Sequence, residues 1–178
     1  MKKKLLAVVA LLLVAVLLLS GCSSHGKTMI KAGNEKISVN LFQLYLSRMK
    51  GELASAGYSV NSADFWNKVI DTDGTTQNEY FTNRVFEGLK QIAAALMLYE
   101  AEGLSLDQSV EDDIDAWIEE LIDSVGNGSK KEFNSILSAY GANVTVLRDS
   151  AIIDAKIAQL KTHLYGEGGR LIGDTAME

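Results

Sequence analysis

The residue with the clearest covalent chemistry is Cys22, because its thiol is the only one in the chain. A lone cysteine can form no intrachain disulfide. Cys22 follows two small residues, Ser20 and Gly21, at the end of an unbroken run of fifteen apolar residues from Leu5 to Leu19. A thiol with small neighbours is accessible to modifying enzymes at a membrane surface. The position therefore favours Cys22 as an attachment point over Cys22 as a metal ligand or a nucleophile.

The segment before Cys22 has the parts of a secretory signal peptide. Three lysines follow the first methionine, and the apolar run is shorter than the roughly 20 residues that cross a bilayer. Residues 19–22, Leu-Ser-Gly-Cys, resemble the bacterial lipobox. This resemblance implies cleavage before Cys22, transfer of a diacylglyceryl group to its thiol and, usually, acylation of the new amino terminus with a fatty acid such as palmitate. A free cysteine or an uncleaved helix anchor is the alternative.

A lipidated start would divide the chain into a signal peptide at 1–21, a lipidated tether at 22–28 and a domain outside the bacterial cell membrane. Two or more acyl chains hold a protein at a membrane stably, whereas one is marginal. The 157 residues left after cleavage suit one domain with a sizeable core. Cleavage removes three lysines and leaves 14 basic and 23 acidic residues, so the net charge moves from −6 to −9. Such an acidic domain is a poor nucleic-acid binder and is repelled by anionic lipid, so the acyl chains must anchor it.

Residues 71–76, Asp-Thr-Asp-Gly-Thr-Thr, hold enough oxygen ligands to suggest a calcium loop. Asp71 and Asp73 would take its third and fifth positions, with the glycine at the sixth. Val69 and Tyr80 would then stand at its first and twelfth positions, where acids are needed. We therefore expect an Asx-type turn here rather than a calcium site.

The other residue types with catalytic or ligand chemistry lack partners at the required spacing. Residues 166–173 are rich in glycine but lack the preceding strand and the lysine of a phosphate-binding loop, so we expect a flexible connector. His25 and His163 stand apart from other metal ligands, and we expect both to be solvated. Four acids stand at one expected helix start: Glu111, Asp112, Asp113 and Asp115. The helix dipole favours acids there, so a solvated cap is expected rather than paired catalytic acids, and no catalytic residue, metal or cofactor is predicted.

Apolar stripes and caps predict a mainly helical domain over residues 29–165, which opens with a short β-hairpin or extended pair. The turn of that pair is expected at 32–35, Ala-Gly-Asn-Glu. The chain has no proline, so glycine, asparagine and aspartate must end the helices. The expected helices are 39–56, 62–70, 77–102, from 105 or 107 to 125, 129–140 and 143–164.

The helix expected at 77–102 has the widest apolar stripe, which indicates burial against more than one neighbour. Leu89, Ile92 and Leu96 lie along this stripe and should be buried. Side chains that can cap the helices stand at most of the expected starts. They are Ser38 or Asn40, Asn61 or Ser62, Ser129 together with Glu132 in a capping box, and Asn143.

Four segments, in this order, resemble the amino-terminal chaperone domain of the SurA/PrsA-type foldases. They are IKAGNEKIS at 30–38, LFQLYLSRMK at 41–50, LKQIAAALMLYEAEGLSLDQSVEDDI at 89–114 and EFNSILSAYGANVTVLRDSAIIDAKIAQL at 132–160. The resemblance covers roughly 28–165 and implies a SurA amino-terminal-like helical domain. The motif that resembles a lipobox favours the lipid-anchored PrsA type over the soluble SurA type.

The resemblance implies a chaperone that binds unfolded or newly secreted polypeptides through an apolar helical groove. Methionine and aromatic side chains suit promiscuous binding, because they adapt in shape or give a large contact area at low entropic cost. The candidates are Phe42, Tyr45, Met49, Tyr58, Phe65, Trp66, Tyr80 and Phe81. Ordinary core packing is the alternative for any one of them. The alternative for the whole chain is a helical envelope lipoprotein that binds one defined partner as an accessory subunit.

In the family that the chain resembles, a parvulin-type prolyl isomerase commonly follows the helical domain. Residues 166–178 are expected to be a glycine-rich connector and the start of a helix, since 175–178, Thr-Ala-Met-Glu, have the form of a capping box. A catalytic domain does not fit in the residues that remain. We therefore expect no isomerase activity from these 178 residues, whether the chain is a truncated foldase or a natural member without the isomerase.

Overall fold

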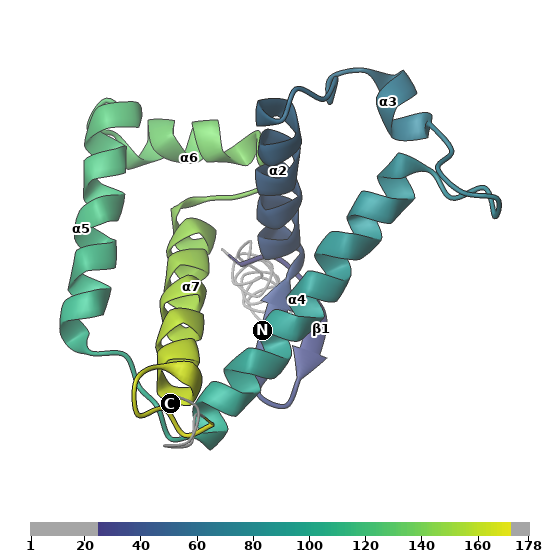
Figure 1. Ribbon diagram of the computed structural model, residues 1–178. Coiled ribbons are helices and arrows are strands. Elements are labelled where there is room, and N and C mark those ends of the chain that lie inside the picture. The colour runs from purple at the N-terminus through teal and green to yellow at the C-terminus, as the bar shows by residue number, and fades with distance from the viewer. Residues whose placement is uncertain (1–24, 172–178) are drawn as a thin grey trace, which may run out of the picture.

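The computed structural model describes residues 25–171, in which six helices follow a two-stranded antiparallel sheet (Figure 1). The elements are β1 (Thr28–Ala32), β2 (Glu35–Ser38), α2 (Val39–Ser55), α3 (Ala63–Asn67), α4 (Gln77–Ala101), α5 (Gln108–Val125), α6 (Lys130–Ser138) and α7 (Val144–Tyr165). The prediction of a mainly helical fold with a strand pair at its start is confirmed. The predictions for 1–21, for Cys22 and for the capping box at 175–178 lie outside the described residues.

Side-chain caps begin most of these helices, as expected. The backbone N–H groups of Leu41 and Val146 donate to Ser38 Oγ at 3.1 Å and to Asn143 Oδ1 at 3.0 Å. Only one of the two hydrogen bonds of the capping box predicted at Ser129 is present. Ser129 Oγ accepts from the Glu132 N–H, but the Glu132 carboxylate turns back to the side-chain amide of Asn127. The complete capping box lies instead at the start of α4, and it was not predicted.

The helix predicted at 62–70 is shorter than expected, because α3 ends at Asn67. Lys68 adopts an extended conformation, and Val69 then pairs with Thr76 in an isolated antiparallel bridge. Between them, Asp71 Oδ1 accepts hydrogen bonds from the N–H groups of Asp73 at 3.0 Å and Thr75 at 2.9 Å. The expected Asx-type turn is therefore confirmed, and it closes a small hairpin where the helix would have continued.

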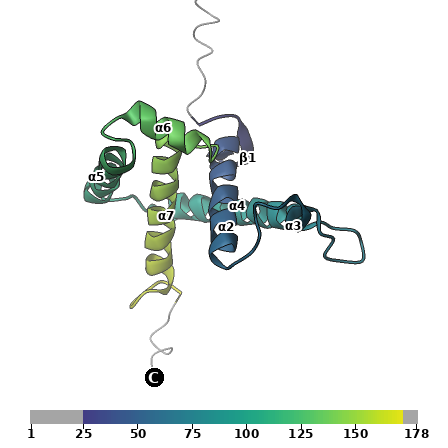
Figure 2. The same cartoon turned by 90° about the horizontal axis from the view of Figure 1, so that it is seen from above.

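The core forms where α4 crosses α2 and α7, and α4 contacts both of them as well as β1 and β2 (Figure 2). Leu89 and Ala93 of α4 join the main cluster, together with Leu44 of α2 and Val146 of α7. In contrast, α5 contacts only α6 and α7 closely among the described elements, and α3 packs mainly on α4. In both views α3 lies at the end of α4 that is farther from α7.

The stripe on α4 is buried only in part. Leu89 and Leu96 are buried, as expected, with 0% and 3% of their surface exposed. Ile92 is only partly buried, which contradicts the prediction. Its side chain packs on the edge of the core and lines a cavity between α2 and α4, so one side of it faces open space.

Candidate functional site

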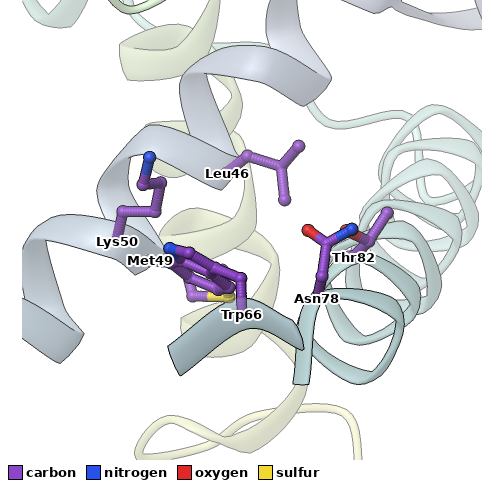
Figure 3. A pocket seen from close by; sticks show the side chains of 6 residues that line it. All are labelled: Leu46, Met49, Lys50, Trp66, Asn78 and Thr82. Atoms are coloured by element: carbon purple, nitrogen blue, oxygen red, sulfur yellow. The ribbon is translucent and has the colours of Figure 1, made fainter. Parts of the chain in front are cut away.

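Two adjoining cavities between α2 and α4 form an open crevice, which we call the α2–α4 crevice. The first has a volume of about 170 Å³. Its lining residues are Leu46, Met49, Lys50, Trp66, Asn78 and Thr82 (Figure 3). The second has a volume of about 330 Å³, and its lining residues are Tyr45, Arg48, Met49, Glu52, Arg84, Val85, Gly88 and Ile92. Met49 lines both cavities, so it stands at their junction.

Helical spacing places these side chains on facing walls. Residues three and four apart lie on the same face of a helix. Leu46, Met49 and Lys50 therefore project from one face of α2, and Figure 3 shows Asn78 and Thr82 of α4 across the cavity from Leu46. Trp66, from α3, closes this end of the crevice. Figure 1 shows that α2 and α4 diverge toward α3.

An aromatic cluster joins α3 to the start of α4. The Phe65 ring centre lies 4.8 Å from that of Trp66, 5.8 Å from Tyr58 and 6.5 Å from Phe81, and the Tyr80 ring lies 5.1 Å from Phe81. Such separations are in the attractive range for aromatic pairs. Trp66 is oriented further by its indole N–H, which donates to the Val60 carbonyl at 2.7 Å. The cluster thus holds the segment around α3 against α4.

The structure brings together seven of the eight residues predicted for a peptide groove. Five form the aromatic cluster, and Tyr45 and Met49 line the crevice next to it. Phe42 packs on the main core and lines neither cavity, whereas Tyr45 packs on that core and also lines the second cavity. None of the eight is fully buried, and Tyr58 and Tyr80 are 53% and 44% exposed.

One wall of the crevice is fixed by a polar network between α2 and α7. Arg48 pairs with Asp154 at 3.4 Å and donates to Ser150 Oγ at 3.0 Å, while the Tyr45 hydroxyl donates to Asp154 at 3.3 Å. Burial, with the nearby Asp154 charge, raises the pKa of Tyr45 to about 12. The Tyr45 hydroxyl therefore keeps its proton at neutral pH and remains a donor to Asp154.

Several lining residues were not predicted, and Gly88 is the one that the sequence could have revealed. An isolated glycine inside a helical pattern usually has a packing or functional reason. A Cβ added at Gly88 would meet nothing within 4 Å, so the missing side chain leaves the crevice wide at this point. Lys50 and Arg84 gave no comparable signal, because exposed cations are common on helices.

The prediction that the His163 side chain is solvated is wrong, because it is partly buried and has a carboxylate partner. His163 Nε2 lies 3.2 Å from one carboxylate oxygen of Glu102, whose other oxygen accepts from Arg170 at 2.8 Å. Arg170 reaches Glu102 because residues 166–171 fold back on α7, with the Arg170 N–H donating to the His163 carbonyl. The described part of the predicted flexible connector is therefore an ordered turn. The His25 side chain is exposed, as expected, although its Nε2 lies 3.0 Å from a carboxylate oxygen of Asp149.

The acidic cluster at the start of α5 is not simply a solvated cap. Arg148 of α7 donates to Asp115 and, at 3.2 Å, to Glu111, and these contacts tie α5 to α7. Hydrogen bonds from Arg148 lower the pKa of Asp115. Asp112 and Asp113 remain exposed. Two of the four acids are thus structural partners of a distant arginine.

Within residues 25–171, no three or more metal-ligating side chains are grouped to hold an ion. None of the helices in this range is long and apolar enough to cross a membrane. No family model matches the chain, and no curated protein or solved structure matches it significantly.

Proposed function

We propose that the chain is a lipid-anchored extracytoplasmic chaperone domain of the SurA/PrsA type, which binds unfolded or newly secreted polypeptides in the α2–α4 crevice. The observation that carries this proposal is the gathering of methionine and aromatic side chains, none fully buried, around an open crevice. Exposed apolar surface of this kind marks interaction sites in soluble domains. The anchor rests on the motif around Cys22, and fatty-acid labelling that is lost in Cys22→Ala would test it.

The shape of the crevice favours an extended polypeptide over a small molecule. Pockets for small ligands usually enclose roughly 300–1,000 Å³ and bury most of the ligand. Here the two cavities, of about 170 and 330 Å³, are open to solvent and share Met49 as a lining residue. Each suits one or two side chains of a chain that passes along α2 and α4.

The composition of the crevice favours many partners over one. Met49, at the junction, is flexible and polarisable, and such side chains adapt to irregular shapes. Trp66 stands on α3, which packs mainly on α4, so small movements of α3 change the width of the crevice with little effect on the core. We expect weak binding to many unfolded chains and little binding to folded ones.

An aggregation-suppression assay with a blocked crevice tests this function. The full chain, purified in nanodiscs, should protect an unfolded client at stoichiometric levels. Gly88→Leu should reduce the protection, because its side chain enters the second cavity without displacing any atom near its Cβ. Gly51→Leu is the matched control, since Gly51 is also a helical glycine with nothing within 4 Å, but it lies outside the crevice.

Three outcomes would contradict the proposal. Equal loss of protection in both variants would show that the loss does not come from blocking the crevice. Equal protection by both would show that clients bind elsewhere. Failure of the unmodified chain to protect any unfolded client would instead favour the alternative, an envelope lipoprotein with one defined partner.

A further inference from the structure

The α2–α4 crevice is lined by more cations than carboxylates, although the chain as a whole is acidic. The chain has 17 basic and 23 acidic residues, which gives a net charge of −6. Arg48, Lys50 and Arg84 line the crevice, against one carboxylate, that of Glu52. An acidic protein repels acidic partners at long range, so a local excess of cations at a binding site bears on specificity.

Arg84 stands out among the arginines of residues 25–171. Arg48, Arg148 and Arg170 each pair with a carboxylate within 4.0 Å. Arg84, the fourth arginine in that range, has no such partner there. A guanidinium group without a carboxylate partner is available to bind a carboxylate of a ligand, and it can donate two hydrogen bonds to that carboxylate at once.

Lys50 offers a second available cation on the opposite wall. It projects from α2 and also has no carboxylate partner within residues 25–171, and its ammonium lies 5.6 Å from the centre of the Trp66 ring. Arg84 projects from α4. Met49, which lines both cavities, stands at the apolar junction of the crevice.

We infer that the crevice selects extended segments in which a large apolar side chain is flanked by carboxylates, and that Lys50 and Arg84 determine this specificity. The inference rests on the proposed function of the crevice. The apolar side chain contacts Met49 and Trp66, while the flanking carboxylates pair with Lys50 and Arg84. Exposed ion pairs are individually weak, so the charges select among clients rather than provide most of the affinity.

Three labelled peptides of equal length test the inference by fluorescence anisotropy. They share one aromatic and aliphatic centre and carry glutamate, glutamine or lysine on both flanks. With the full chain in nanodiscs of zwitterionic lipid, the glutamate peptide should bind about three- to tenfold more tightly than the glutamine peptide, as expected for two exposed ion pairs. The lysine peptide should bind most weakly. The differences should shrink at high salt, which screens exposed charges.

Charge reversal identifies the residues responsible. Lys50→Glu with Arg84→Glu should reverse the order of the three peptides. Lys131→Glu with Lys161→Glu changes the net charge by the same amount at exposed positions outside the crevice, and should keep the order. Circular dichroism checks the fold, and Lys50→Gln with Arg84→Gln, which should abolish the preference, replaces the reversed variant if that variant does not fold.

The results separate the two proposals. If none of the three peptides binds, the proposed function fails. If all three bind equally, or if the order survives reversal of Lys50 and Arg84, the charge selection is wrong and the proposed function stands. If the variant with Lys131 and Lys161 changed reverses the order as well, the preference reflects net charge alone and the inference is wrong.

Discussion

The two halves of α4 lie in different surroundings. In the second half Leu89, Ala93, Leu96 and Tyr99 are buried, each with 3% or less of its surface exposed. In the first half, from Gln77 to Gly88, no residue is buried, and the neighbours are half-exposed aromatic rings and the open crevice. One continuous helix therefore provides core packing at one end and the wall of a proposed binding site at the other.

This contrast explains how a small domain can keep an apolar surface exposed. Burial of aliphatic side chains at the crossing of α4 with α2 and α7 stabilises the fold. The aromatic residues near α3 add less to stability, since part of their surface stays in water. Stability and the proposed binding are thus assigned to different residues of one helix, and substitutions should separate them.

The largest expected effect is on stability, in the buried half. Leu89→Ala should lower the free energy of unfolding by about 2–5 kcal/mol, because Leu89 is fully buried and the substitution leaves a cavity. Phe81→Ala, in the exposed half, should cost less, about 1–2 kcal/mol. Denaturant melts of both variants measure the difference. Equal losses would show that the aromatic cluster is as much a part of the core as Leu89.

The next effect is on binding, in the crevice half. Trp66→Ala should weaken binding of an unfolded client about tenfold, as loss of a large aromatic anchor does in other interfaces. The chain has one other tryptophan, Trp117 on α5, which is 41% exposed and lies outside the crevice. Trp117→Ala is therefore the matched control and should bind as the unmodified chain does. A loss of affinity in Trp117→Ala and not in Trp66→Ala would move the binding surface to α5.

The smallest effect tests whether the crevice wall is open at Gly88. Gly88→Ala should raise the free energy of unfolding by about 0.5–1 kcal/mol, because alanine favours the helix and its Cβ meets no other atom. Gly51→Ala should give a similar gain for the same reason. Thermal or denaturant melts suffice. A destabilised Gly88→Ala beside a stabilised Gly51→Ala would mean that another segment packs on Gly88 and that the crevice is closed.

Local signals in the sequence were enough to predict the elements and several turns. The apolar stripes gave all six helices of the described residues, and Ser38 and Asn143 cap where they were expected. The turn at Asp71 followed from its own side chain. These features depend on residues within a few positions of each other, so one sequence contains the information.

The features that were missed depend on contacts between distant segments. Arg148 meets Asp115 across 33 residues of sequence, and His163 meets Glu102 across 61. Ile92 is only partly buried because its side chain lines a cavity between α2 and α4. Phe42 and Tyr45 looked alike as candidates, and both pack on the core, yet only Tyr45 also lines the crevice. Neither the periodicity nor the composition of the sequence shows which distant segments come into contact.

Photo-crosslinking of a bound client tests the central claim most directly. An unfolded client with a photoreactive phenylalanine analogue is bound to the full chain in nanodiscs, irradiated, and mapped by mass spectrometry. We predict crosslinks at residues 45–52 of α2, at Trp66 and at 78–92 of α4, and their loss when an excess of unlabelled unfolded client competes. Crosslinks that gather on α5 and α6, or that spread evenly over the surface, would contradict a binding site between α2 and α4.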